Sequence, residues 1–176
     1  MSPRRSARSR SILLAKSFGP IPANFLSDSH PLRGEDAVAA IITVEDGRYL
    51  VQLRDDIPRI FYPGHWGCFG GAVGAGEDRL GALQRELAEE LEMPPAPASE
   101  FITLNFDLSR LGQKQCYRTY YEIKVTAAAV SRYVLHEGAA MRLASPAELF
   151  DLRLTPYDSF ALWLHFARGR FSGNAV

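Results

Sequence analysis

The chain has 176 residues, and 47% of them are hydrophobic, which is enough apolar material for one sizeable core. A chain of this length favours one domain over two. Twenty basic and twenty acidic residues cancel, so the overall charge gives no reason to expect a nucleic-acid or membrane partner. The two cysteines, Cys68 and Cys116, are too few for a disulfide framework, and no apolar run is long enough for a membrane span. We therefore expect a cytoplasmic protein with a small polar ligand.

Residues 1–35 are predicted to form a basic tail and an N-terminal arm, followed by one domain over residues 36–176. The tail is typical of a solvated terminus, although a transit peptide or a polyanion-binding arm would also be basic; its arginines are Arg4, Arg5, Arg8 and Arg10. Prolines and weak periodicity between residues 17 and 33 predict a connecting segment.

The first strands are predicted from two apolar runs. Residues 37–44 are rich in β-branched side chains and end at Glu45-Asp46-Gly47, and residues 49–54 resume the pattern, so a β-hairpin is expected. A short aromatic strand over residues 66–69 then runs into Gly70-Gly71, where the absence of side chains lets a ligand approach the backbone.

Residues 77–92 are predicted to be helical. One stripe of the helix faces the core and consists of Leu80, Leu83, Leu87 and Leu91. Glu86, Glu89 and Glu90 stand at i, i+3 and i+4 and share a different face. Negative charges at such short distances repel each other unless a cation lies in front of them. Carboxylate oxygens are ligands that Mg²⁺ prefers. A divalent metal site is therefore the first hypothesis.

The second half of the chain predicts further strands and two helices. Strands are expected over residues 100–108 and 115–125, with short ones over 133–136 and 141–143. Ser145 and Thr155, each followed by proline, are predicted helix starts, and the second helix places Phe160, Leu164 and Ala167 on one face. This mixed order of strands and helices favours a mixed sheet between helices.

The segment from Gly71 to Met93 resembles the Nudix box, GX5EX7REUXEEXGU, in which U is a bulky apolar residue. Glycine and charged positions match at fixed spacing, and one position departs, because Glu92 stands where the family has a glycine. Pro94 and Pro95 still end the helix. The resemblance covers residues 36–168 and implies an α/β/α sandwich with a central mixed β-sheet.

The resemblance also implies an activity. It points to a Mg²⁺-dependent pyrophosphohydrolase, with Mn²⁺ as a substitute, that cleaves the diphosphate bond of a nucleoside diphosphate linked to another moiety. The implied metal ligands are the Gly71 carbonyl, Glu86, Glu89 and Glu90.

The resemblance assigns further residues of the catalytic apparatus. Arg85 is expected to pair with Glu77 and orient the loop between Gly71 and the helix. A general base must reach the attacking water, and Glu86, Glu89 and Glu137 are the candidates. Glu137 is included because many family members carry an additional acidic residue after the late strands; the choice among the three is open. His65 and His136 are weaker candidates for a contact with phosphate or water.

Three residues are candidates for substrate binding. Arg54 can hold a phosphate with two hydrogen bonds, whereas Tyr62 and Trp66 can stack on a base or sugar unless they belong to the core. The segment from Arg54 to Gly71 resembles a Nudix subgroup associated with oxidised nucleotides or nucleotide sugars.

Two other classes of function compete with hydrolysis. An isoprenyl-diphosphate isomerase would need a reactive cysteine facing a glutamate, for which Cys68 is the one candidate, although no isomerase cysteine motif surrounds it. A non-catalytic nucleotide-binding regulatory module commonly loses box carboxylates, which this chain retains. The N-terminal arm and the aromatic late strands offer surfaces for a homodimer.

Overall fold

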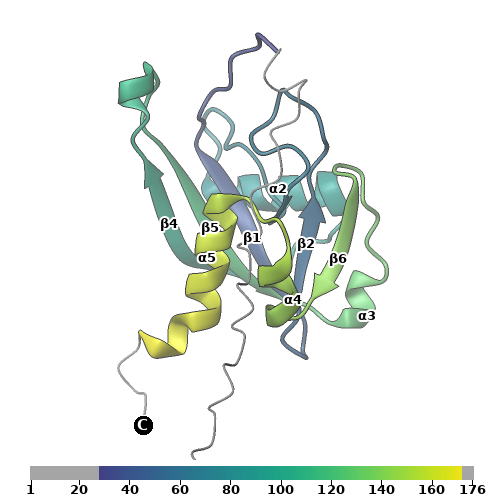
Figure 1. The fold of residues 1–176 in the computed structure, drawn as a ribbon. Coiled ribbons are helices and arrows are strands. Elements are labelled where there is room, and N and C mark those ends of the chain that lie inside the picture. Colours follow the sequence, from purple (N-terminus) through teal and green to yellow (C-terminus); the bar gives the residue numbers. More distant parts are fainter. Residues whose placement is uncertain (1–27, 172–176) are drawn as a thin grey trace, which may run out of the picture.

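The computed structural model describes residues 28–171 as a mixed six-stranded sheet with helices on both faces (Figure 1). The strand order is β3-β2-β1-β5-β4, and β6 pairs with β2. The pair β1–β5 is parallel and the other pairs are antiparallel. The strands are β1 (Ala37–Thr43), β2 (Tyr49–Leu53), β3 (Trp66–Gly67), β4 (Ala98–Phe106), β5 (Cys116–Lys124) and β6 (Ala140–Ala144).

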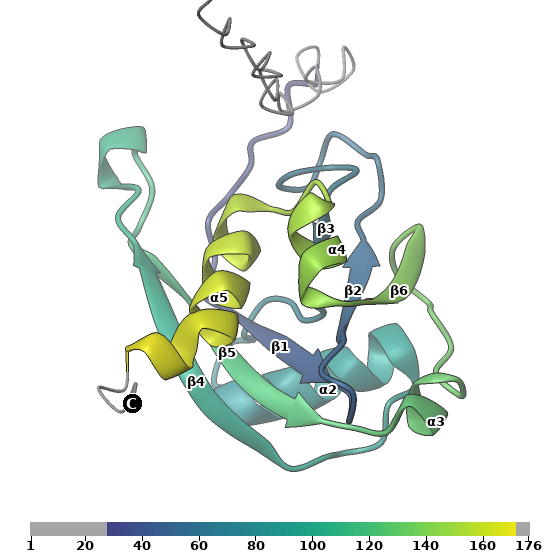
Figure 2. The ribbon, with the colours of Figure 1, turned by 60° about the horizontal axis from the view of Figure 1, so that its bottom comes forward.

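The helices form the outer layers. The helix α2 (Arg79–Leu91) covers one face of the sheet, and α4 (Pro146–Asp151) and α5 (Pro156–Ala167) cover the other (Figures 1 and 2). The predicted α/β/α sandwich is therefore confirmed. The remaining helical segments are short: η1 (Ser109–Leu111), α3 (Ala127–Val130) and η2 (Arg168–Arg170). No helix among residues 28–171 is long and apolar enough to cross a membrane.

Each face of the sheet has its own hydrophobic core. On the α2 side, Val38, Ala40 and Ile42 of β1 pack with Leu83 and other buried residues of α2. On the α5 side, the alternate β1 residues Ala39 and Ile41 pack with residues of α5. This alternation follows from the two-residue repeat of a β-strand. It explains why residues 37–43 read as a continuous apolar run, since both faces of β1 are buried.

The helix starts follow the expected capping chemistry. The Asp78 side chain accepts hydrogen bonds from the N–H groups of Leu80 (3.1 Å) and Gly81 (2.9 Å), so α2 begins two residues after the predicted position at Glu77. The starts predicted at Ser145 and Thr155 are confirmed, because each side chain accepts a hydrogen bond from a backbone N–H in the first turn of its helix.

Two local predictions are wrong. Residues 133–136 form a loop and no strand, because the N–H groups of Val134 and His136 bond to carbonyls at the end of α2 and do not join the sheet. Leu80 is 38% exposed and lies outside the core stripe, which consists of the other three leucines. Phe160, Leu164 and Ala167 share one face of α5 as predicted, but this face is not uniformly buried, since Phe160 is 51% exposed and Ala167 is buried.

The predicted tail, residues 1–10, and most of the predicted connecting segment lie outside the described residues.

Candidate active site

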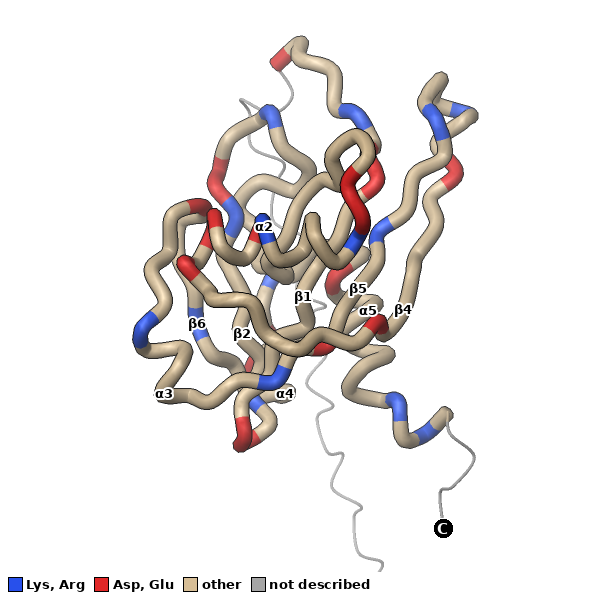
Figure 3. Tube along the Cα trace, turned by 180° about the vertical axis from the view of Figure 1, so that it is seen from behind, with Lys and Arg blue, Asp and Glu red and all other residues tan. Residues whose placement is uncertain are grey.

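Acidic positions gather around α2 (Figure 3). The three glutamates of the shared helix face differ in environment: Glu89 is exposed, Glu86 is half-buried and Glu90 is only 4% exposed. Glu90 lies toward the sheet because α2 packs there through its leucines. The same spacing along the helix thus produces one buried, one intermediate and one accessible carboxylate.

Glu90 is fixed by two polar contacts in its buried position. Its Oε2 accepts a hydrogen bond of 2.9 Å from the N–H of Gly70, and its Oε1 lies 3.4 Å from Nε2 of Gln52 on β2. Burial raises the pKa of Glu90 to about 7, although the Gly70 hydrogen bond opposes this rise, and nearby carboxylates, Glu137 and Glu86, add to it. The buried charge is therefore expensive for the protein when no cation is present.

Glu86 packs directly against the loop that contains Gly71. A Cβ added at Gly71 would lie 2.5 Å from the Glu86 carboxyl carbon, so any other residue there would require this carboxylate to move. The Gly71 carbonyl accepts a hydrogen bond of 2.9 Å from the N–H of Val38, and its second lone pair is available to another partner. Burial raises the pKa of Glu86, while the neighbouring Arg85 opposes the rise.

Arg85 links the loop to the acidic face of α2. Its Nε and Nη2 donate to the two carboxylate oxygens of Glu77 at 2.9 and 3.0 Å, which gives a bidentate pair. Nη1 donates to Glu86 (2.9 Å) and Glu89 (3.1 Å), and Nη2 also donates to the Ala72 carbonyl (3.0 Å). The hydrogen bonds to Arg85 lower the pKa of Glu77. One guanidinium thus orients both the loop and the two less buried glutamates.

Glu137 lies on the loop between α3 and β6, close enough to α2 for its charge to raise the pKa of both Glu86 and Glu90. The loop is held at both sides of Glu137. The N–H of His136 donates to the Glu90 carbonyl at 2.9 Å, and the N–H of Ala139 donates to the Leu53 carbonyl at 2.8 Å. The structure therefore places Glu137 near the acidic face of α2, and its role as a general base stays a prediction.

The candidate substrate residues lie along the ends of β2 and β3. The Arg54 Nε donates to the Phe61 carbonyl (3.0 Å), so this side chain braces the loop after β2. The ring of Tyr62 meets that of Tyr157 at 5.6 Å between centroids. Trp66 is partly buried against the α5-side core. Tyr62 is 37% exposed, whereas Arg54 and Trp66 are both partly buried.

The sequence analysis missed Arg118 and Tyr157, which adjoin Tyr62 through the contact between the Tyr62 and Tyr157 rings. The guanidinium of Arg118, on β5, lies 5.1 Å from the Tyr157 ring centroid and is paired with Asp158 at 3.4 Å. Its Nε and Nη2 are buried and find no hydrogen-bond partner among the described residues. The sequence did contain a signal for Arg118, because it is a charged residue within an aromatic strand. The two-residue alternation of the strand places it on the same face as buried residues.

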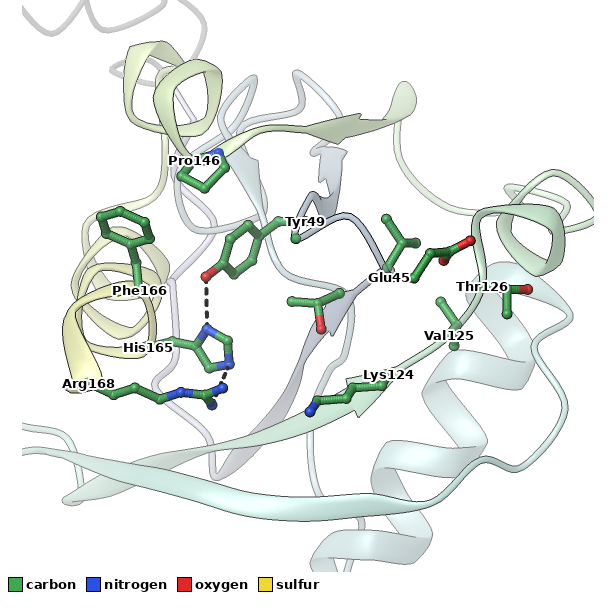
Figure 4. A pocket seen from close by; sticks show the side chains of 12 residues that line it. Glu45, Tyr49, Lys124, Val125, Thr126, Pro146, His165, Phe166 and Arg168 are labelled. Atoms are coloured by element: carbon green, nitrogen blue, oxygen red, sulfur yellow. Dashed lines mark hydrogen bonds between the residues drawn. The ribbon is translucent and has the colours of Figure 1, made fainter. Parts of the chain in front are cut away.

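A separate hollow of about 700 Å³ lies on the α5 side of the sheet (Figure 4). Its lining includes Tyr49, Lys124 and His165, and the Tyr49 hydroxyl lies 2.9 Å from His165 Nδ1. Burial lowers the pKa of His165, which favours the neutral ring. The hollow contains none of the glutamates described above, so the acidic face of α2 is the candidate for chemistry.

A comparison with protein-family models finds the NUDIX domain over residues 34–171, which is most of the chain. The chain belongs to the Nudix family. It is accordingly a pyrophosphohydrolase, an enzyme that cleaves a diphosphate linkage. A comparison with curated proteins found no significant match.

Solved structures share the Nudix fold. The chain resembles the MutT protein from Methanosarcina mazei Go1 with a TM-score of 0.63 and 22% identity, covering 81% of this chain and 99% of that one. The E. coli ORF135 protein gives a TM-score of 0.60 with 25% identity, covering 82% and 96%. The Nudix domain of Shewanella oneidensis NrtR, solved with ADP ribose, gives 0.60 with 17% identity, covering 87% and 100%.

The Nudix site residues fit a divalent metal in their chemistry. They supply hard oxygen donors, and burial, reinforced by neighbouring carboxylates, raises the pKa values of Glu86 and Glu90, so a cation beside them would favour their charged forms. Within residues 28–171 no three acidic, histidine or cysteine side chains already converge in a metal-binding arrangement. The reason is visible in the contacts, since Arg85 holds Glu86 and Glu89 while Gly70 and Gln52 hold Glu90.

Cys68 of the Nudix domain is poorly suited to isomerase chemistry. Its side chain is 2% exposed and packs in the core on the α5 side, on the other face of the sheet from α2. Burial raises the pKa of the thiol well above its usual range, so the nucleophilic thiolate is disfavoured. Its backbone N–H donates to Asp158 at 3.0 Å, which is a structural contact.

Proposed function

We propose that the protein is a Mg²⁺-dependent hydrolase of a nucleoside diphosphate linked to another moiety, with an oxidised deoxynucleoside triphosphate or a nucleotide sugar as the favoured substrate. The observation that carries the proposal is the arrangement of Glu86 and Glu90 against the Gly70-Gly71 loop, with Arg85 bridging to Glu77. This arrangement gathers negative charge beside a backbone that a ligand can approach.

Glu86, Glu89, Glu90 and the Gly71 carbonyl would hold the metal, and Mn²⁺ offers the same preference for oxygen ligands. Bound Mg²⁺ supplies charge neutralisation of the diphosphate and lowers the pKa of a water. Glu90 is already fixed by the Gly70 N–H, so it acts as the rigid member of the set. Arg85 keeps Glu86 and Glu89 in place and directs the loop toward them.

The general base is one of two exposed carboxylates, Glu89 or Glu137. Both carry accessible oxygens, whereas Glu90 is buried and Glu86 packs against Gly71. The variants Glu89→Gln and Glu137→Gln show which of the two residues is the general base and whether either binds the metal. Loss of the base removes the acidic limb of the pH profile of kcat, whereas loss of a metal ligand raises the Mg²⁺ concentration that is needed.

The nucleoside portion of the substrate is assigned to the edge formed by Arg54, Tyr62 and Tyr157. Arg54 follows Leu53, whose carbonyl holds the loop of Glu137, so this edge adjoins the acidic site. Tyr62 and Tyr157 offer aromatic surface for a base, and Arg118 behind them has unused hydrogen-bond donors. Tyr62→Ala should raise KM severalfold with little change in kcat, because stacking contributes to ground-state and transition-state binding alike.

A Mg²⁺-dependent assay across oxidised deoxynucleoside triphosphates, nucleotide sugars, ADP-ribose and dinucleoside polyphosphates tests the proposal. We expect one class to be hydrolysed well above the others, and Glu90→Gln to abolish turnover while the protein stays folded. A flat response over the whole panel would refute the proposed substrate class. Tight nucleotide binding without turnover under any metal would instead favour the regulatory module.

A further inference from the structure

The end of α2 carries a glutamate in a conformation that favours glycine. Glu92 has φ 51°, in the left-handed region, and its N–H donates to the Ala88 carbonyl at 3.0 Å. The following N–H, of Met93, donates to the Leu87 carbonyl at 3.2 Å. This is a glycine-type helix end, and a side chain is disfavoured there by contact between Cβ and the backbone. The choice of glutamate therefore needs a reason other than helix termination.

The Glu92 side chain makes one contact that glycine could not make. Its Oε1 lies 2.6 Å from Nε2 of His136, which is the residue before Glu137. The pair is solvent-accessible, with 60% of the Glu92 side chain and 48% of the His136 side chain exposed. In the described part of the chain it is the one side-chain hydrogen bond between α2 or its cap and the loop of residues 133–139.

The same loop is attached to α2 through its backbone. The N–H groups of Val134 and His136 donate to the carbonyls of Leu91 (3.2 Å) and Glu90 (2.9 Å). Carbonyls in the last turn of a helix lack partners within the helix, so the loop satisfies them. The contact of His136 with Glu92 adds a side-chain anchor immediately before Glu137.

We propose that Glu92 and His136 form a positioning pair that holds Glu137 against the metal-binding carboxylates of α2. This inference rests on the proposed hydrolase function. The His136 Nε2 that was a candidate for a phosphate or water contact lies against Glu92 instead, so we assign both residues a role through the position that they give to Glu137. Gly138, with φ 91°, turns the chain directly after Glu137, so the carboxylate stands between an anchored residue and a fixed turn.

The variant Glu92→Gly separates positioning from stability. Glycine adopts the left-handed backbone conformation at this position without the Cβ contact that disfavours it for glutamate, so the melting temperature should rise by about 2–4 °C. It also removes the contact with His136, so Glu137 and its negative charge are no longer held beside Glu86 and Glu90. The Mn²⁺ affinity measured by electron paramagnetic resonance should fall about tenfold because that charge attracts the cation, and kcat should fall about tenfold as well. Glu92→Gln keeps a hydrogen-bonding oxygen for His136 and should retain most of both. The exposed Glu100→Gln, on β4, controls for the loss of a surface charge.

Two further measurements test whether the pair acts through Glu137. Hydrogen exchange at the N–H groups of Val134 and His136 should accelerate in Glu92→Gly, because the loop loses its side-chain anchor. In a Glu137→Gln background, Glu92→Gly should cost less than twofold in kcat and Mn²⁺ affinity. An equal loss in both backgrounds, or unchanged Mn²⁺ affinity and loop exchange in Glu92→Gly, would overturn the positioning role.

These readouts distinguish failure of the positioning pair from failure of the proposed function. If the wild type hydrolyses nothing in the substrate panel, the hydrolase proposal fails, whereas Mn²⁺ affinity and loop exchange still decide whether Glu92 and His136 hold Glu137. If the wild type is active and Glu92→Gly matches it in every readout, only the positioning role fails.

Discussion

Replacing Glu90 by glutamine should make the metal-free protein more stable at neutral and alkaline pH. Glu90 is almost fully buried, and its pKa is raised from an ordinary 4.5 to about 7, mainly by burial. The folded protein therefore binds the Glu90 proton more tightly than the unfolded chain does. The stability from this proton is complete below about pH 4.5 and is lost as the pH rises through about 7.

The size of the effect follows from the two pKa values. Their difference corresponds to about 3 kcal/mol of free energy of unfolding, and the polar contact with Gly70 does not change this sign. For a chain of this length, that energy is a difference of roughly 6–12 °C in melting temperature. Glutamine cannot ionise, and its amide oxygen can still accept the Gly70 hydrogen bond.

The assay is thermal unfolding with a chelator present, between about pH 5 and pH 8, for the wild type and Glu90→Gln. The wild-type melting temperature should fall relative to that of the variant as the pH rises. Glu89→Gln is the matched control, because Glu89 is exposed on the same helix. Added Mg²⁺ should restore the wild type at high pH and leave Glu90→Gln unchanged. Parallel curves for the wild type and Glu90→Gln would refute the reasoning.

Four further substitutions test the packing and the site. Leu83→Ala should lose about 2–5 kcal/mol of unfolding free energy because Leu83 is fully buried, whereas Leu80→Ala should change it by less than ~1 kcal/mol; chemical denaturation measures both. Gly71→Ala should lower Mn²⁺ affinity about tenfold in a binding titration, since its Cβ would displace the Glu86 carboxylate; unchanged affinity would contradict this. Arg85→Lys should lower kcat at least about tenfold with little change in melting temperature, because lysine cannot form the bidentate pair; equal activity would rule that out.

The sequence predicted the features that depend on local periodicity. The β1–β2 hairpin, the α2 helix with its buried leucines, and the capped starts of α4 and α5 follow from spacing and capping residues. The acidic face of α2 was likewise visible, because three carboxylates at helical spacing lie together whatever surrounds them.

What the sequence could not give depends on contacts between distant segments. Residues 133–136 have strand-like composition, but the unpaired carbonyls at the end of α2 compete for their N–H groups. The different burial of Glu86, Glu89 and Glu90 is set by how α2 lies on the sheet, which periodicity alone does not determine. Arg118 was missed for the same reason, since its neighbour Tyr157 lies on a helix far along the chain.

The two cores on either side of β1 divide the molecule into parts that are packed separately. The carboxylates of α2 are supported by one core, while Arg118, Tyr157 and the surroundings of α5 belong to the other face. The two sides are connected near Gly70 and Glu90 through Cys68, whose N–H donates to Asp158 of α5 and whose carbonyl lies 3.4 Å from the Gln52 amide that also contacts Glu90. Under the proposed assignment of Tyr62 and Tyr157 to the nucleoside, substrate recognition can diversify on one side of the sheet while the carboxylates of α2 on the other side stay as they are.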